Sequence, residues 1–134
     1  AERWAQASAK GGNPKGMMEY AAILYENGDV NGFRHWNEQA ASISFATTVY
    51  GYGSDLAHEP DTYGYPYDVV KGYALVSLLK ELNGGGGLDT SVADKLPKIA
   101  EKMTATQIEQ AKKYAIEWKA SHPPLSFYPE KLGL

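Results

Sequence analysis

Residues 20–41 read "YAAILYENGDVNGFRHWNEQAA", and this stretch decides the fold. Aromatic and alanine residues recur at helical spacing on both sides of an Asn-Gly-Asp break. Asn27-Gly28 is typical of a helix end, and Asp29 is a good N-cap for a following helix that carries Trp36 and Ala40 on one face. The stretch therefore predicts an αα-hairpin, in which alanines let two helices approach and aromatic rings fill the remaining space.

Length and composition indicate one globular domain. The chain has 134 residues, 43% of them hydrophobic, and a net charge of −3. No Lys/Arg-rich stripe is present, so nucleic acid is disfavoured as a partner. No apolar run is long enough to span a bilayer, so we expect no membrane insertion. We also expect no cofactor, and the absence of cysteine excludes disulfides and Cys-based metal or redox chemistry.

The cellular compartment stays open from the sequence. A cysteine-free chain fits a reducing cytosol and an exported protein equally well. Its first residue is Ala1, without a methionine, which suits either a mature exported protein after signal removal or a trimmed chain. The sequence thus slightly favours an exported, periplasmic protein over a cytoplasmic one.

A repeat becomes visible when residues 1–12 are compared with residues 33–44. Trp4 aligns with Trp36, followed in each copy by a pair of small residues at the same spacing. The offset of about 32 residues matches the period of helix-pair repeats. Gly11-Gly12 ends the first copy, and a new helix is expected to start near Lys15. Repeated hairpins of this kind stack into solenoids.

The region from residue 42 to residue 83 predicts a degenerate third unit. Its first helix, around "SISFATTVYGYG", is expected mainly by analogy, because Ile43 and Val49 would also suit a strand. The segment 54–67 is expected to form a long loop. Asp68 then caps a helix whose apolar residues share one face.

The last pair of helices is expected between residues 88 and 121. Asp89 is the predicted N-cap of the first helix, in which Pro97 should cause a kink or a restart. Thr104-x-x-Gln107 is a capping box and predicts the start of the second. Pro123-Pro124 should end that helix.

The fold class predicted from these elements is all-α: an αα-hairpin repeat solenoid, or right-handed superhelix, of about six or seven helices. The predicted domain covers residues 1–121. Its units are 1–12 (partial), 13–41, 42–83 and a terminal pair at 88–121, and residues 122–134 form an extended tail.

These residues resemble the Sel-one-like helical repeats, relatives of the tetratricopeptide repeat. Leu24-Tyr25-x-x-Gly28, Asp29 and Trp36-x-x-x-Ala40-Ala41 match most of the family's unit, and Trp4 matches the second half of a preceding one. Phe33 in place of alanine, Leu75 in place of tryptophan and the inserted loop depart from it. The resemblance covers roughly residues 1–121 and implies a scaffold for protein partners. Because such scaffolds bind many different partners, it does not identify one.

Catalytic and metal-binding residues are not evident in the sequence. His35, His58 and His122 lack metal-ligand spacing. The segment Asp55–Asp61 is the one polar cluster suited to a cation or to acid/base work, although a solvated loop explains it too. The glycines at 84–87 lack the Gly-Lys-Ser/Thr ending of a phosphate loop and are interpreted as a linker.

The candidate binding residues are tyrosines, which cluster within 24 residues around the predicted loop. Tyrosine combines contact area with a polar tip and is enriched in protein interfaces. The candidates are Tyr50, Tyr52, Tyr63, Tyr65, Tyr67 and Tyr73. The alternative interpretation, an aromatic cluster that pins the loop to its own helices, stays equally open.

The sequence as a whole predicts a non-enzymatic protein-binding module of undetermined oligomeric state. Among exported bacterial proteins, the resemblance implies as one role an immunity or inhibitor protein that neutralises a secreted toxin or effector. Two alternatives remain. One is a general assembly adaptor, and the other is a small hydrolase or cell-wall-processing enzyme that uses the Asp55–Asp61 loop.

Overall fold

The computed structural model describes residues 2–81 and 88–126. They form seven α-helices and one short 3-10 helix, with no strand beyond an isolated bridge, which confirms the predicted all-α class. The helices are α1 (Glu2–Lys10), α2 (Pro14–Glu26), α3 (Val30–Ser42), α4 (Ala46–Leu56), α5 (Val69–Leu78), the 3-10 helix η1 (Leu79–Glu81), α6 (Leu88–Ala100) and α7 (Ala105–Ser121). The glycines at 84–87 and the residues from 127 onward lie outside the described part.

Most helix starts are set by local capping, as the sequence predicted. Asp29 accepts a hydrogen bond from the backbone N–H of Gly32, and Asp68 accepts one from Lys71. Thr104 and Gln107 form both bonds of the capping box at the start of α7. Each cap satisfies a backbone donor that the first turn leaves unpaired.

Three local expectations differ from the structure. Helix α4 runs to Leu56, so the loop begins three residues later than the predicted Ser54. Helix α6 begins at Leu88 rather than after an Asp89 cap, and it continues through Pro97 without a restart. Proline removes one backbone donor, and Ala93, whose carbonyl loses that donor, is exposed, as is Pro97. Water can therefore donate a hydrogen bond to this carbonyl, so α6 tolerates the proline.

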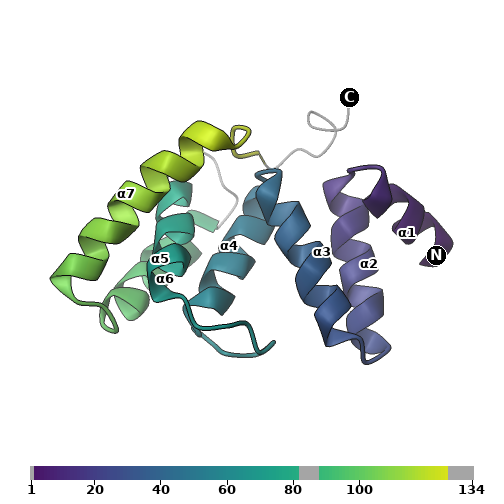
Figure 1. The fold of residues 1–134 in the computed structure, drawn as a ribbon, viewed down its shortest axis with the longest axis horizontal. Helices are drawn as coiled ribbons and strands as arrows, with labels where there is room; N and C mark the ends of the chain where they lie inside the picture. The colour runs from purple at the N-terminus through teal and green to yellow at the C-terminus, as the bar shows by residue number, and fades with distance from the viewer. Residues whose placement is uncertain (1, 82–87, 127–134) are drawn as a thin grey trace.

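The helices pack largely in chain order, from α1 at one end of the molecule to α7 at the other (Figure 1). Helices α1, α2 and α3 form consecutive neighbours, α3 packs on α4, and α4 packs on α5. Helix α5 then contacts both α6 and α7. Among the described residues, no helix is both long and apolar enough to cross a membrane.

Helices α4 and α5 approach closely because glycines face each other in their contact. A Cβ atom built on Gly72 would lie 2.5 Å from the carbonyl oxygen of Gly53 and 2.9 Å from the backbone nitrogen of Ala57. A Cβ on Gly53 would in turn lie 3.0 Å from the carbonyl oxygen of Gly72. These contacts fix the spacing of the two helices at the centre of the molecule.

The core divides into a large cluster and a small one. The large cluster joins α4, α5, α6 and α7 through buried residues that include Leu75, Val76 and Ile99. The small cluster lies between α1, α2 and α3, where the partly buried Trp36 ring meets Tyr20 edge-on at 5.8 Å. Trp4, the residue that aligns with Trp36 in the sequence, is 53% exposed.

Residues 123–126 return to the junction between α3 and α4. The backbone N–H of Ala46 donates to the Ser126 carbonyl at 2.8 Å, and the N–H of Ser126 donates to the Ser44 carbonyl at 3.0 Å. The buried Ser44 hydroxyl donates to the carbonyl of Pro123. The chain after α7 is thereby fixed beside the N-terminus of α4.

Candidate functional site

The six candidate tyrosines do not form one exposed surface. Tyr52 and Tyr65 are buried, at 6% and 5% exposure, and their rings meet edge-on at 5.5 Å. Tyr67 is 52% exposed and packs on the ring of His58. The remaining three, Tyr50, Tyr63 and Tyr73, are half-buried and lie on different parts of the fold.

Tyr63 and Tyr65 attach the loop between α4 and α5 to helix α3. The Tyr63 ring packs on Phe33 at 4.5 Å, and the Arg34 guanidinium donates to the Tyr63 carbonyl at 2.5 Å. The Asn37 amide donates to the Tyr65 hydroxyl at 2.9 Å. Burial raises the pKa of Tyr65 well above its usual value. These contacts make the two side chains part of the folded scaffold.

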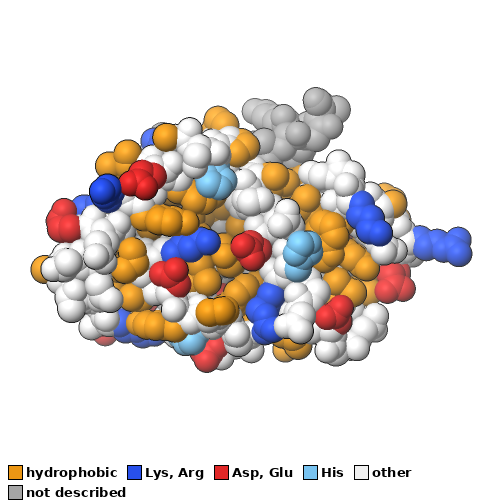
Figure 2. Space-filling view, viewed as in Figure 1, with side chains coloured by type: hydrophobic (Ala, Val, Ile, Leu, Met, Phe, Trp, Pro, Cys, Tyr) orange, Lys and Arg blue, Asp and Glu red, His pale blue; other side chains and the backbone are white. Residues whose placement is uncertain are grey.

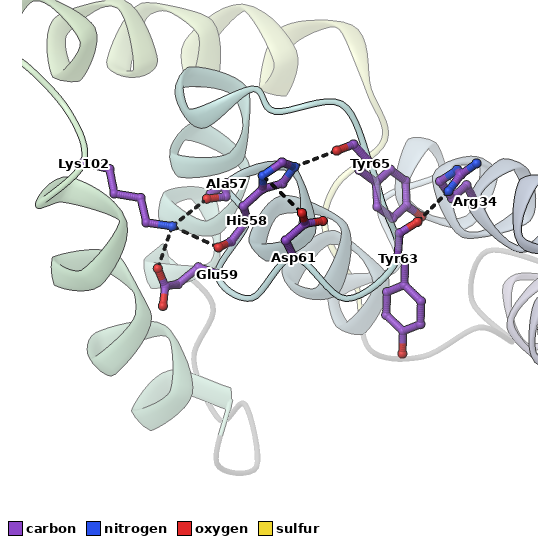
Figure 3. Close-up of polar contacts among 8 residues, drawn as sticks. All are labelled: Arg34, Ala57, His58, Glu59, Asp61, Tyr63, Tyr65 and Lys102. Atoms are coloured by element: carbon purple, nitrogen blue, oxygen red, sulfur yellow. Dashed lines mark hydrogen bonds and ion pairs between the residues drawn. The ribbon is translucent and has the colours of Figure 1, made fainter.

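The other side of the same loop is held by Lys102, which follows α6 (Figure 3). Its ammonium donates to the carbonyls of Ala57 and His58 at 3.0 and 2.9 Å and pairs with the Glu59 carboxylate at 2.8 Å. The hydrogen bond from Lys102 is the largest cause that lowers the pKa of Glu59, and the positive charge of Lys102 lowers it further. Lys102 thus caps the C-terminus of α4, where the helix dipole is negative.

His58 also serves the loop. Its Nε2 lies 2.6 Å from the Tyr65 carbonyl oxygen, and because a carbonyl only accepts, Nε2 carries the proton. Its Nδ1 lies 3.7 Å from the Asp61 carboxylate. Figure 3 shows the His58 ring between these two partners; Nε2 is engaged inside the loop, and Nδ1 pairs with Asp61 only when it is protonated as well.

Asp55 is the most perturbed acid of the predicted polar cluster. The residue is 8% exposed at the end of α4, and burial raises the pKa of its carboxyl from 3.8 to about 6. The positive charge of Lys95 opposes this rise, Asp61 adds to it, and His58 opposes it. Burial is the dominant cause, since it disfavours the charged form of any carboxyl that lacks a close counter-ion.

A cavity of about 130 Å³, hereafter the central cavity, lies between α3, α4, α5 and α7. It is lined by Glu38, Ala41, Ser42, Tyr52, Lys71, Leu75, Tyr114, Trp118 and His122. Figure 2 shows one face of the molecule, at whose centre hydrophobic side chains gather with basic and acidic side chains among them. The lining therefore combines residues from α3 and α4, earlier in the chain, with residues from α5 and α7, later in the chain.

Lys71 is the cationic group of this cavity. Its ammonium lies 5.4 Å from the centre of the Tyr52 ring, over the ring face. Burial lowers the pKa of Lys71, but the phenols of Tyr52 and Tyr114, a hydrogen bond to Tyr52 and the charge of Glu38 outweigh it, so the pKa is raised. Lys71 therefore carries its charge at neutral pH.

The wall opposite α3 is aromatic. Trp118 is 8% exposed, and the His122 ring stacks on it with centroids 3.9 Å apart and planes 9° from parallel. His122 Nδ1 also lies 2.7 Å from the Trp118 carbonyl oxygen. This stack gives the cavity a flat, fixed boundary at the end of α7.

Sequence reasoning identified one residue of this cavity, Tyr52, as a candidate. Trp118 was expected in the final helix as core, and Glu38, Lys71 and Tyr114 were not singled out. These positions come from α3, α5 and α7, and no local motif connects them. The weak signal available was a lysine, Lys71, in the otherwise apolar start of α5.

Comparison with known proteins adds no family: no protein-family model, no curated protein and no solved structure matches this chain. Within residues 2–81 and 88–126, no three His, Cys, Asp or Glu side chains are grouped so that they could hold a metal ion.

Proposed function

We propose that this protein is a protein-binding module built as a right-handed superhelical array of helix pairs, similar to Sel-one-like repeats. The observation that supports the proposal best is the central cavity, which is lined by Tyr52, Tyr114 and Trp118 together with the charged Lys71. Aromatic residues with few charges are typical of the energetic centre of protein interfaces. The packing of α1 to α5 in chain order agrees with a repeat array.

The tyrosines of the loop contribute to this function indirectly. Tyr63 and Tyr65 contact α3, so their ring surfaces hold the loop in place and are not free for a partner. Tyr67 is the exposed member of the set and the one that a partner meets directly. The proposal therefore places the main partner contact in the central cavity and its rim.

The role we propose for the module is that of an immunity or inhibitor protein that neutralises a secreted toxin or effector. A general assembly adaptor is the alternative within the same class. Both functions use the same surface, and the partner distinguishes them: a toxin encoded beside this protein and inactivated by it supports immunity. An adaptor instead binds a component whose activity is unchanged by the contact.

The test compares partner capture by three matched proteins. Tyr114→Ala truncates a half-buried ring at the central cavity, and Tyr67→Ala truncates an exposed ring on the loop. A partner captured by the unmodified protein should bind Tyr114→Ala more weakly by roughly 2 kcal/mol, the usual hot-spot level, and Tyr67→Ala almost normally. Thermal unfolding must show both variants folded. Normal capture by Tyr114→Ala with loss by Tyr67→Ala would move the interface to the loop.

A second candidate function, hydrolysis by the Asp55–Asp61 loop, has one observation in its favour. A carboxyl with a pKa of about 6 is suited to general acid/base work near neutral pH. Against it, the Nε2 of His58 is engaged inside the loop by the Tyr65 carbonyl. Hydrolysis of cell-wall fragments by the unmodified protein and its loss in Asp55→Asn would support this candidate over binding.

A further inference from the structure

The central cavity holds the ammonium of Lys71, which the fold contacts without a close ion pair. Lys71 is half-buried and lies over the face of Tyr52. No carboxylate among the described residues forms an ion pair with it, whereas Lys102 and Lys112 both have such partners. The phenols of Tyr52 and Tyr114 and the charge of Glu38 keep this ammonium charged, but no carboxylate among the described residues stands within ion-pair distance of it. A ligand that brings a carboxylate to Lys71 would gain a partner already in place.

The size of the cavity limits what can enter. Its volume of about 130 Å³ is close to that of an engineered cavity of ~150 Å³ that binds benzene. One side chain fits such a space and a folded peptide segment does not. Leu75 and Ala41 provide apolar contact for a short hydrocarbon stem, and Lys71 provides the charge for its end.

We propose that the central cavity is a subsite for one acidic side chain, aspartate or glutamate, of the protein partner, with Lys71 as its counter-ion. The inference rests on the proposed binding function and names the chemistry that the partner presents. Glu38, also on the cavity lining, works against this ligand, because its negative charge repels a second carboxylate. The same charge excludes ligands that offer only a weak or poorly placed anion.

The test uses N-acetylglutamate N-methylamide as the probe and the neutral glutamine analogue as its control. Binding is followed by ¹H–¹⁵N spectra of the three tryptophan indoles. Trp118 lines the cavity, while Trp4 and Trp36 lie in α1 and α3 outside its lining and act as internal references. The glutamate probe should shift the Trp118 signal saturably, with affinity of roughly millimolar order, and the glutamine analogue should bind at least about tenfold more weakly.

Three variants separate the cavity from other basic sites. Lys71→Met keeps the hydrocarbon stem and should weaken the glutamate probe at least about tenfold, and Glu38→Gln should strengthen it roughly two- to threefold. Lys112→Met, on the exposed face of α7, should change nothing. Equal binding of both probes, or loss with Lys112→Met and not with Lys71→Met, would overturn the subsite. If Lys71→Met does not fold, a Glu38→Gln variant that fails to tighten binding would do the same.

The subsite and the proposed function can fail separately. Lys71-dependent probe binding with no protein partner found supports the subsite and counts against the binding module. A partner that binds Lys71→Met as well as the unmodified protein, while the probe does not, contradicts the assignment of the subsite to the partner's side chain.

Discussion

Replacing Gly72 by alanine tests whether the close contact of α4 and α5 fixes the centre of the fold. The new Cβ would lie 2.5 Å from the Gly53 carbonyl oxygen, where ordinary contact begins at 3.4 Å, so the helices must separate by about 0.9 Å. The atoms in the way belong to the backbone and cannot rotate aside. A gap of this size forfeits roughly a quarter to a half of each dispersion contact, and overpacking costs about 1 to 3 kcal/mol.

The matched control is Gly51→Ala in α4. A Cβ on Gly51 meets nothing within 4 Å, so this variant isolates the helix-propensity gain of alanine, about 0.5 to 1 kcal/mol. The same gain applies to Gly72→Ala and offsets part of its packing cost. We therefore expect Gly72→Ala to lose about 1 to 2 kcal/mol of unfolding free energy and Gly51→Ala to gain about 0.5 to 1.

The assay is urea unfolding followed by far-ultraviolet circular dichroism, with the denaturant slope checked for equality among the three proteins. If Gly72→Ala is as stable as Gly51→Ala, the close helix contact does not exist and the packing described for the centre of the molecule is wrong. A lower slope for Gly72→Ala would instead mean that the change altered the unfolded or native state as a whole.

Two further predictions concern charges around the loop. Because burial raises the pKa of Asp55 from 3.8 to about 6, the folded state disfavours its charge; this penalty is absent below pH 3.8, grows between the two values and is complete above pH 6. Asp55→Asn should therefore have a higher unfolding free energy than the unmodified protein, and this gain should be about 2 to 3 kcal/mol larger at pH 7.5 than at pH 4. Urea unfolding at the two pH values measures the gain, and a gain that does not change with pH would refute this prediction. Lys102→Met removes the donor to the Ala57 and His58 carbonyls and should cost about 1 to 2 kcal/mol in the same assay, whereas Lys112→Met, whose ion pair is exposed, should stay within about 0.5; equal losses would contradict the capping role of Lys102.

Much of the helical pattern could be predicted because its signals are local. The caps at Asp29, Asp68 and Thr104 each need only a side-chain oxygen and a backbone donor three residues away. Residues this close in sequence meet whatever the rest of the chain does. The left-handed glycine that follows α2, Gly28 with φ of 86°, belongs to the same class of signal.

Helix α4 was harder to predict, because its stability comes from tertiary contacts. Val49 is suited to a strand by intrinsic preference, yet it is fully buried in the helical core. Helix α4 is stabilised by its close packing against α5 through Gly53 and Gly72. No sequence pattern predicts that two glycines from different helices will meet. The central cavity escaped prediction for the same reason, since Lys71 and Trp118 lie far apart in the chain.

The loop between α4 and α5 has a role that its tyrosines alone did not reveal. It is held by Arg34 of α3 and by Lys102, which follows α6, so it connects the N-terminal and C-terminal parts of the molecule (Figure 3). Closing a longer loop costs little extra entropy, and a charged donor at each side offsets that cost. The loop therefore joins α3, which forms one wall of the central cavity, to the end of α6.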